Sequence, residues 1–247
     1  MKELTQAQYT DRWWWARRGR PTASEFGKII TPKTEKPSEQ ATGYAFELIA
    51  DLYDAEYGKT DEFASAAMLN GSMMEPEAVR WYEFERELEI RKTGLCVTDD
   101  GRFGGSPDAM AGEDGGLEVK CPKASTHLFY LHKRELPPIY KPQVHGLLIV
   151  TGRSWWDFMS YCPPHPPLLL RIVPDGFTSK LRDEIESFWN TLETLKRELN
   201  LDPPPCWEEP PEPTEKHEGE YDNFSADMLG GVEDGEEVPE IDARMVL

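Results

Sequence analysis

The sequence has no apolar run long enough to cross a membrane. A spanning helix needs about 18 to 20 consecutive apolar residues, and none occurs in this chain of 247 residues. Residues 1–12 are polar and have no apolar core of the kind that a secretory signal contains. We therefore expect a cytoplasmic protein with no membrane partner.

Clustered cysteines are also lacking. The chain has 4 cysteines, and no two of them form a C-x-x-C pair that could clasp zinc or an iron–sulfur cluster. Disulfides are rare in cytoplasmic proteins of this size. We expect reduced, structural cysteines at positions 96, 121, 162 and 206.

Basic residues are fewer than acidic ones, and most of the excess negative charge lies in one segment of the chain. The formal net charge is −19, and residues 201–247 alone hold 15 acidic and 2 basic side chains, a net of −13. The other 200 residues therefore carry only −6. Because binding follows the local patch and not the total charge, such a domain can still hold a basic channel for nucleic acid.

The same change in composition predicts the domain organisation. Residues 1–200 alternate helical and strand patterns and are expected to form one domain. Residues 201–247 are acidic, rich in proline and glycine, and too poor in apolar surface to fold alone, so we expect a flexible tail. Its apolar islands, Tyr221–Phe224 and Met228–Leu229, leave open a partner-docking motif, and its charge leaves open an internal mimic of DNA.

Periodicity predicts an α/β fold. The expected helices cover 22–30, where Thr22 and Glu25 have the spacing of a capping box, and then 41–57, 71–89, 125–133, 141–150 and 178–199. Pro76 is expected near the first turn of the third of these. The expected strands cover 95–98, 116–121, 155–161 and 168–173.

The most informative stretch runs from Gly104 to Pro122. Alternate side chains of a strand share a face, so Glu118 and Lys120 point the same way while Val119 points into the core. A glycine turn at 114–116 folds this strand back towards Asp108. Two carboxylates and an ammonium are therefore expected at one end of a sheet.

This group of side chains suits metal-dependent phosphodiester hydrolysis. Carboxylate oxygens with open positions favour Mg²⁺, with Mn²⁺ as a substitute, and the backbone carbonyl of Val119 is a further expected ligand. A lysine beside the metal can stabilise developing negative charge or orient the attacking water. Taken singly, Glu118 and Lys120 also fit a solvated strand face and Asp108 a turn, so their combination carries the hypothesis.

Beyond the chemistry, the motif S-P-D followed by L-E-V-K-C-P resembles the nuclease motif of the lambda-type phage exonucleases, the YqaJ-like viral recombinases of the PD-(D/E)XK superfamily. Three further segments resemble that family in the right order. They are Trp15–Glu25, with its R-x-G-x-x-T-A-S-E pattern, Asn70–Glu75, and Tyr140–His145, where His145 replaces a second glutamine.

The resemblance implies a role for each matching residue. Asp108 and Glu118 would be metal ligands and Lys120 the catalytic lysine. Glu75 would help to hold a second ion or its water, and Gln143 would orient the lysine or the water. A further set would grip the DNA 5′-phosphate: Arg17, Ser24 and Ser106.

The resemblance also implies a fold and an activity. The fold would be a restriction-endonuclease-like core with a small mixed sheet flanked by helices. The activity would be Mg²⁺-dependent 5′→3′ digestion of one strand of linear double-stranded DNA by a homotrimer in a bacterial or phage-infected cell. The resulting 3′ overhang would be used by a single-strand annealing protein.

Two alternatives remain open. One is a structure-specific or restriction-like endonuclease on the same core, and the other is a non-catalytic DNA-binding or DNA-mimic protein. The run Trp13–Trp15 also has two interpretations, stacking on DNA ends or packing in the core, and we expect one or two of the three to pack.

Overall fold

The computed structural model describes residues 1–4, 6–54 and 66–204, and for 66–73 the backbone alone. The chain divides into a compact unit, Met1–Pro210, and a second unit, Pro211–Leu247. The expected tail at 201–247 lies outside the described residues from 205 onward, so its flexibility stays a prediction. Among the described residues, no helix is both long and apolar enough to span a bilayer.

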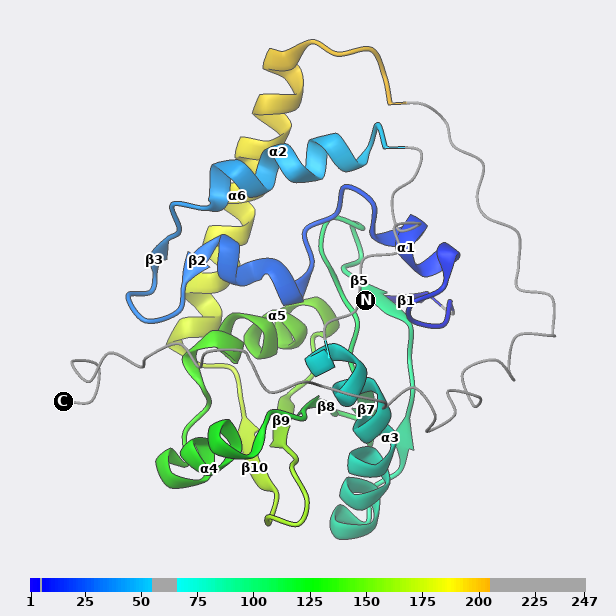
Figure 1. Cartoon of the computed structure of the whole chain (residues 1–247). Helices are drawn as coiled ribbons and strands as arrows, with labels where there is room; N and C mark the ends of the chain where they lie inside the picture. Colours follow the sequence, from blue (N-terminus) through cyan, green and yellow to red (C-terminus); the bar gives the residue numbers. More distant parts are fainter. Residues whose placement is uncertain (5, 55–65, 205–247) are drawn as a thin grey trace, which may run out of the picture. The chain divides into compact units, whose positions relative to one another are not determined.

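A five-stranded sheet organises the domain, in the order β10-β9-β8-β7-β4 (Figure 1). Its strands are β4 (Ile90–Arg91), β7 (Ala109–Ala111), β8 (Gly115–Lys120), β9 (Trp155–Ser160) and β10 (Leu168–Ile172). Strands β8 and β9 are parallel, with Glu118 opposite Phe158, and all other neighbours are antiparallel. The sheet is therefore small and mixed, as predicted.

Helices cover both faces of this sheet. One face packs on α3 (Ala66–Arg86) through a cluster that includes Leu117, Val119 and Met159. The other face packs on the larger core, which includes Phe158. The helices of this core are α2 (Ala41–Asp51), α5 (Lys141–Thr151) and α6 (Gly176–Leu199). Helix α4 (Ala124–Lys133) lies at one end of the sheet (Figure 1). Because β8 is buried on both faces, Glu118 lies inside the protein.

A second, three-stranded sheet holds the N-terminal segment in the order β1-β5-β6. Its strands are β1 (Lys2–Leu4), β5 (Leu95–Val97) and β6 (Gly104–Gly105). Two further elements are the hairpin of β2 (Ile30–Thr31) and β3 (Lys36–Pro37) and the short helix η2 (Pro138–Tyr140). Helix α1 (Asp11–Arg17) follows β1 and packs near β5. The N-terminal segment is thereby brought to the edge of the main sheet.

The structure corrects several predictions. The tight turn expected at 114–116 lies at 112–114, and Gly115 and Gly116 belong to β8. Helix α3 begins at Ala66 and ends at Arg86, so Pro76 lies in its interior and not in its first turn. Helix α2 ends at Asp51, and residues 55–57 of the expected helix lie outside the described residues. The expected helix at 22–30 is a 3₁₀-helix, η1 (Ala23–Lys28).

No capping box forms at the start of η1. The Thr22 side chain makes no cap hydrogen bond there, because its hydroxyl accepts a hydrogen bond from Arg17 instead. The Glu25 carboxylate pairs with Lys28, 3.2 Å away. Of the two residues with capping-box spacing, Thr22 thus contacts α1 and Glu25 forms an ion pair within η1.

Close packing along β8 depends on its glycines. A Cβ on Gly116 would lie 2.3 Å from the Trp156 ring, which is fully buried and cannot move aside. At Gly176, the first residue of α6, an added Cβ would meet nothing within 4 Å. These two positions make a matched pair for testing the packing of the sheet.

We predict opposite effects for these two substitutions. Gly116→Ala should lower the free energy of unfolding by about 1–3 kcal/mol through overpacking. Gly176→Ala should raise it by about 0.4–1 kcal/mol, because alanine restricts the unfolded chain. Urea denaturation of both variants measures the two changes, and equal stability of wild type and Gly116→Ala would contradict the packing described here.

Candidate active site

Asp108 is fixed to β8 by a hydrogen bond from the backbone. It follows Pro107 and precedes β7, and its Oδ2 accepts from the Val119 N–H at 2.6 Å. In a β-strand the N–H and C=O of one residue leave the chain on the same side. The Val119 carbonyl therefore faces the side on which Asp108 lies.

Glu118 lies at the centre of the site and is only 1% exposed. Its Oε1 accepts from Gln143 Nε2 at 2.5 Å and pairs with Lys120 Nζ at 2.6 Å. Gln143 comes from α5, which covers this face of the sheet, so strand and helix together position the carboxylate. The two-residue spacing brings Glu118 and Lys120 together, as the sequence predicts.

Lys120 and Glu75 complete the group. The Lys120 ammonium lies 5.3 Å from the centre of the Tyr140 ring, a cation–π contact that the sequence analysis did not identify. Glu75 reaches the site from α3, where its carboxyl lies in the electrostatic field of Asp108, Lys92 and Lys120. The five residues predicted to be catalytic therefore converge: Glu75, Asp108, Glu118, Lys120 and Gln143.

Burial of so many charges perturbs their protonation. Desolvation, followed by repulsion from Asp108, raises the pKa of Glu118 to about 8 and that of Glu75 to about 7. Desolvation also raises the pKa of Asp108, against the attraction of Lys120. For Lys120, burial works to lower the pKa, but Glu118 and Asp108 outweigh it and raise the pKa. Three carboxyls so close together need compensating positive charge.

The donor set fits a hard divalent cation. Within the described part of the chain, Glu118 Oε2 is buried and accepts no hydrogen bond, which leaves one carboxylate oxygen for another partner. No three His, Cys, Asp or Glu side chains of the described residues make a closed metal cage. A set of two carboxylates and a backbone carbonyl, completed by water and phosphate oxygens, is the kind that Mg²⁺ accepts.

A second cluster gathers the predicted phosphate-binding residues. The Arg17 guanidinium donates to Thr22 at 3.0 Å, to Ser24 at 3.4 Å and to Ser106 at 3.5 Å. Ser106 lies two residues before Asp108, so this cluster and the carboxylates share one segment of chain. Guanidinium and hydroxyl donors together suit a terminal phosphate. Thr22, which the sequence predicts to cap a helix, belongs to this cluster.

The tryptophan run belongs mainly to the core, as expected. Trp13 is 4% exposed, its Nε1 donates to Ser106 at 2.9 Å, and Arg17 stacks over its ring at 4.4 Å. Trp14 packs partly buried against the same cluster. Trp13 therefore both fills the core and orients Ser106 and Arg17.

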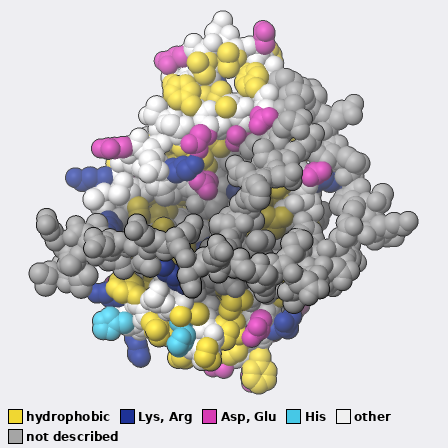
Figure 2. All heavy atoms as spheres, viewed as in Figure 1, with side chains coloured by type: hydrophobic (Ala, Val, Ile, Leu, Met, Phe, Trp, Pro, Cys, Tyr) yellow, Lys and Arg dark blue, Asp and Glu magenta, His cyan; other side chains and the backbone are white. Residues whose placement is uncertain are grey.

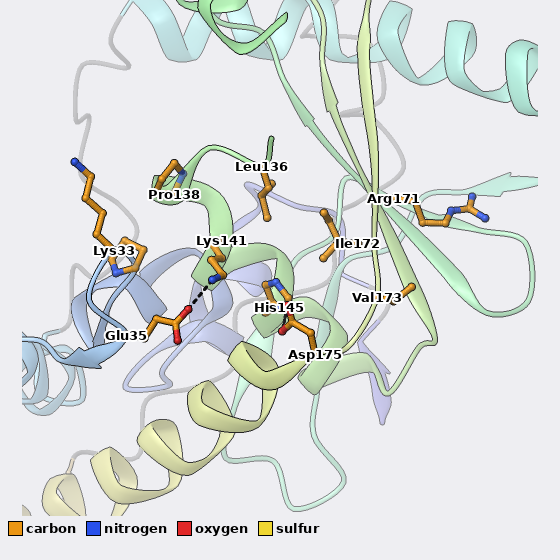
Figure 3. Close-up of a pocket in the computed structure, with 11 residues that line it drawn as sticks. Lys33, Glu35, Leu136, Pro138, Lys141, His145, Arg171, Ile172, Val173 and Asp175 are labelled. Atoms are coloured by element: carbon orange, nitrogen blue, oxygen red, sulfur yellow. Dashed lines mark hydrogen bonds and ion pairs between the residues drawn. The ribbon is translucent and has the colours of Figure 1, made fainter. Parts of the chain in front are cut away.

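His145, which replaces a glutamine of the family pattern, does not reach the carboxylates. It is buried, and its Nδ1 shares a hydrogen bond with Thr178 at 2.8 Å, near Asp175 at the start of α6. It lines a separate cleft with a volume of about 580 Å³ (Figure 3). In this cleft Lys141 pairs with Glu35 at 2.9 Å. The substitution thus affects the α5–α6 contact and not the site.

Charged side chains are unevenly spread over the surface. Figure 2 shows the acidic side chains of the viewed face mostly over α2 and the far half of α6. Lys, Arg and His side chains lie among apolar ones at the opposite end, where α4 lies. On the face shown, part of the surface is therefore less acidic than the region around α2.

The core is restriction-endonuclease-like. At one end of its mixed sheet lie two carboxylates, a lysine and a glutamine, the arrangement expected of a nuclease site. The comparisons agree with this class. The family model of the YqaJ-like viral recombinase domain matches residues 12–154. The chain belongs to this family, and it is a phage-type exonuclease, a hydrolytic nuclease.

Solved structures show the same relationship. LHK-Exo in complex with dAMP is 30% identical with a TM-score of 0.66, and the match covers 77% of this chain and 98% of that one. A second structure of LHK-Exo, an alkaline exonuclease from Laribacter hongkongensis, is 28% identical over the same shares with a TM-score of 0.63. No curated protein matches the sequence.

A third structure shares the fold alone. The phage-related exonuclease from Haemophilus somnus is 15% identical, with a TM-score of 0.57, over 73% of this chain and 96% of that chain.

We predict that divalent metal binding releases protons. With the pKa of Glu118 at about 8 and that of Glu75 at about 7, the metal-free carboxyls are partly protonated at neutral pH. A cation needs the ionised forms, so its affinity should rise as the pH rises from 6 to 9. Calorimetric titration with Mn²⁺ in two buffers of different ionisation enthalpy counts the protons, and an affinity independent of pH would contradict the prediction.

Proposed function

We propose that this protein degrades one strand of linear double-stranded DNA in the 5′→3′ direction, releasing mononucleotides and leaving a 3′ overhang. The observation that supports the proposal best is that Asp108, Glu118 and Lys120 lie together. The segment that holds Asp108 also holds Ser106, which accepts a hydrogen bond from Arg17. A hydrolytic centre lies next to a cluster suited to a terminal phosphate. LHK-Exo, the relative at 30% identity, was solved with dAMP, a mononucleotide of the kind that such digestion releases.

In this proposal the cofactor is Mg²⁺, replaceable by Mn²⁺, with a pair of ions at each site. Asp108, Glu118 and the Val119 carbonyl would hold the first ion, and Glu75 would help to hold the second. Bound metal would polarise the phosphoryl oxygen and lower the pKa of the attacking water.

The chain's own residues would do the rest. Lys120 stays an ammonium because of its acidic neighbours, so it can stabilise the charge that develops on the scissile phosphate. Gln143 holds Glu118 Oε1 and thereby presents Oε2, the oxygen without a hydrogen bond among the described residues. Tyr140 lies beside Lys120 and limits the motion of its ammonium.

The Arg17 cluster would set the polarity of digestion. Its donors would bind the 5′-phosphate of the strand end with Ser24 and Ser106. A strand whose terminal phosphate is held there presents its next phosphodiester to the carboxylates. Digestion from a free 5′ end would then follow without any reading of the base sequence.

The remaining parts of the proposal concern assembly. A homotrimer would retain the DNA by encircling it, and a single-strand annealing protein would use the 3′ overhang, in the cytoplasm of a bacterial or phage-infected cell. These rest on the family membership. The alternative of an endonuclease remains distinct, because it requires no free end.

We predict that Lys120→Ala abolishes cleavage and spares DNA binding. The ammonium acts on the transition state, so its loss should reduce the rate by at least about 100-fold. Gel-shift titration with EDTA present should give a nearly unchanged Kd, since one of many charges near the DNA is lost. Undiminished cleavage by this variant would remove Lys120 from the proposed mechanism.

We predict that Arg17→Ala removes the preference for a 5′-phosphate. Wild type should digest 5′-phosphorylated duplex faster than 5′-hydroxyl duplex, and the variant should digest both at the slower rate. The charge-assisted hydrogen bonds at stake correspond to about a 10- to 100-fold change. Arg197, an exposed arginine of α6, provides the control as Arg197→Ala. A preference that persists in Arg17→Ala would contradict the assigned phosphate site.

A further inference from the structure

Tyr9 is an exposed aromatic residue with an unusual backbone conformation. Its φ is +67°, in the left-handed region that tyrosine rarely adopts and glycine adopts freely. Its side chain is 60% exposed, so the ring contributes little to the core. A strained, exposed aromatic residue is the kind of outlier that marks a functional position.

The neighbours of Tyr9 explain why its conformation is fixed. Gln8 Nε2 donates to the Pro107 carbonyl at 2.8 Å and to the Thr93 carbonyl at 3.2 Å. Thr10 caps α1 by accepting from Trp13 N at 3.3 Å. Tyr9 lies between these two anchored residues, and Gln8 ties this turn to the residue before Asp108.

The Tyr9 ring extends an aromatic column that ends at the phosphate-binding cluster. Its centre lies 5.3 Å from that of the Trp13 ring, at an interplanar angle of 44°. Trp13 in turn lies under Arg17 and donates to Ser106. Trp13 is buried, so Tyr9 is the member of this column that faces solvent.

The Tyr9 hydroxyl lies in the electrostatic field of the carboxylates. Desolvation of the hydroxyl first, although the residue as a whole is 60% exposed, and then Glu75 and Asp108, raise its pKa, while Lys120 and Arg17 oppose the shift. Tyr9 is thus within electrostatic reach of both halves of the site. It remains an uncharged phenol at neutral pH, so it does not add to the negative charge that DNA must approach.

We propose that Tyr9 forms a stacking subsite for the nucleobase of the terminal 5′ nucleotide. This inference rests on the proposed function, in which one nucleotide joins the phosphate at Arg17 to the phosphodiester at Asp108 and Glu118. The base of that nucleotide must leave its own duplex stack to reach the site. An exposed aromatic ring beside Trp13 replaces the lost stacking, for any of the four bases.

The subsite would act on the strand that is cut. Stacking would hold the terminal nucleotide while Arg17 holds its 5′-phosphate, so the scissile bond would be presented with less freedom. Because every base has a π face, Tyr9 would add affinity without sequence preference. The anchored turn around Tyr9 keeps the ring in place before DNA binds, which reduces the entropy lost on binding.

The direct test measures stacking without cleavage. The Lys120→Ala protein is titrated onto a 5′-phosphorylated duplex whose terminal 5′ base is 2-aminopurine, a base whose fluorescence is quenched by stacking. We expect stronger quenching with Tyr9 present than in Lys120→Ala/Tyr9→Gly, and the full effect in Lys120→Ala/Tyr9→Phe, which keeps the ring. Equal fluorescence with and without the ring would overturn the proposal, as would loss of quenching in the phenylalanine variant.

Activity gives a second readout. In the otherwise wild-type protein, Tyr9→Gly should lower kcat/KM for duplex digestion about tenfold, and Tyr9→Phe should stay close to wild type. The thermal midpoint of Tyr9→Gly should not fall, because glycine adopts the positive φ without strain. The control Phe84→Ala removes an aromatic ring that is 84% exposed on α3, and it should leave the rate unchanged.

The outcomes separate the two proposals. If wild type digests 5′-phosphorylated ends and Tyr9→Gly digests them equally fast, the stacking subsite is wrong and the exonuclease stands. If wild type releases no nucleotide from such ends, the proposed function fails, and the stacking subsite fails with it.

Discussion

The hydrogen bond from Val119 N–H to Asp108 is the contact on which the site depends. It joins the residue before β7 to the middle of β8 and therefore fixes two carboxylates from different segments against each other. Glu118 and Lys120 then follow from the alternation of a single strand. Gln143 and Glu75 are added by the helices on opposite faces, α5 and α3. One short strand, closed by its hairpin with β7, thus positions Asp108, Glu118 and Lys120, and two helices supply the rest of the group.

Burial makes this arrangement costly without a cation. Glu118 is buried and Asp108 is half-buried, and desolvation raises the pKa of both carboxyls. Lys120 neutralises only part of this charge. Replacing ionisable groups with apolar ones would stabilise many folds, and keeping them is consistent with a site that is completed by metal and phosphate. The same reasoning applies to Tyr9, whose backbone conformation glycine would adopt with less strain.

Much of the catalytic group could be predicted from the sequence, because most of the residues that form it lie close together in the chain. The spacing of Glu118 and Lys120 and the hairpin that brings them towards Asp108 follow from strand geometry, and the family resemblance located Arg17 and Gln143. The position of the tight turn did not follow, because the glycines expected in it belong to β8. Other features depend on contacts between distant segments. Strands of two or three residues, such as β4 and β7, have no periodicity to read. The Thr22 hydroxyl accepts a hydrogen bond from Arg17 and does not cap the helix as expected. The hydrogen bond from Gln8 to Pro107 joins residues 99 positions apart in the chain.

Digestion of duplex DNA with a defined topology tests whether the protein is an exonuclease that requires a free DNA end. Linear 5′-phosphorylated duplex and the same sequence as a covalently closed circle are incubated with the protein in Mg²⁺, and again in EDTA. We predict that the linear substrate releases mononucleotides in Mg²⁺ and not in EDTA, and that the 3′-ended strand remains intact. Cutting of the closed circle would show an endonuclease, and the absence of any cleavage would show that the carboxylate group is not a hydrolytic centre.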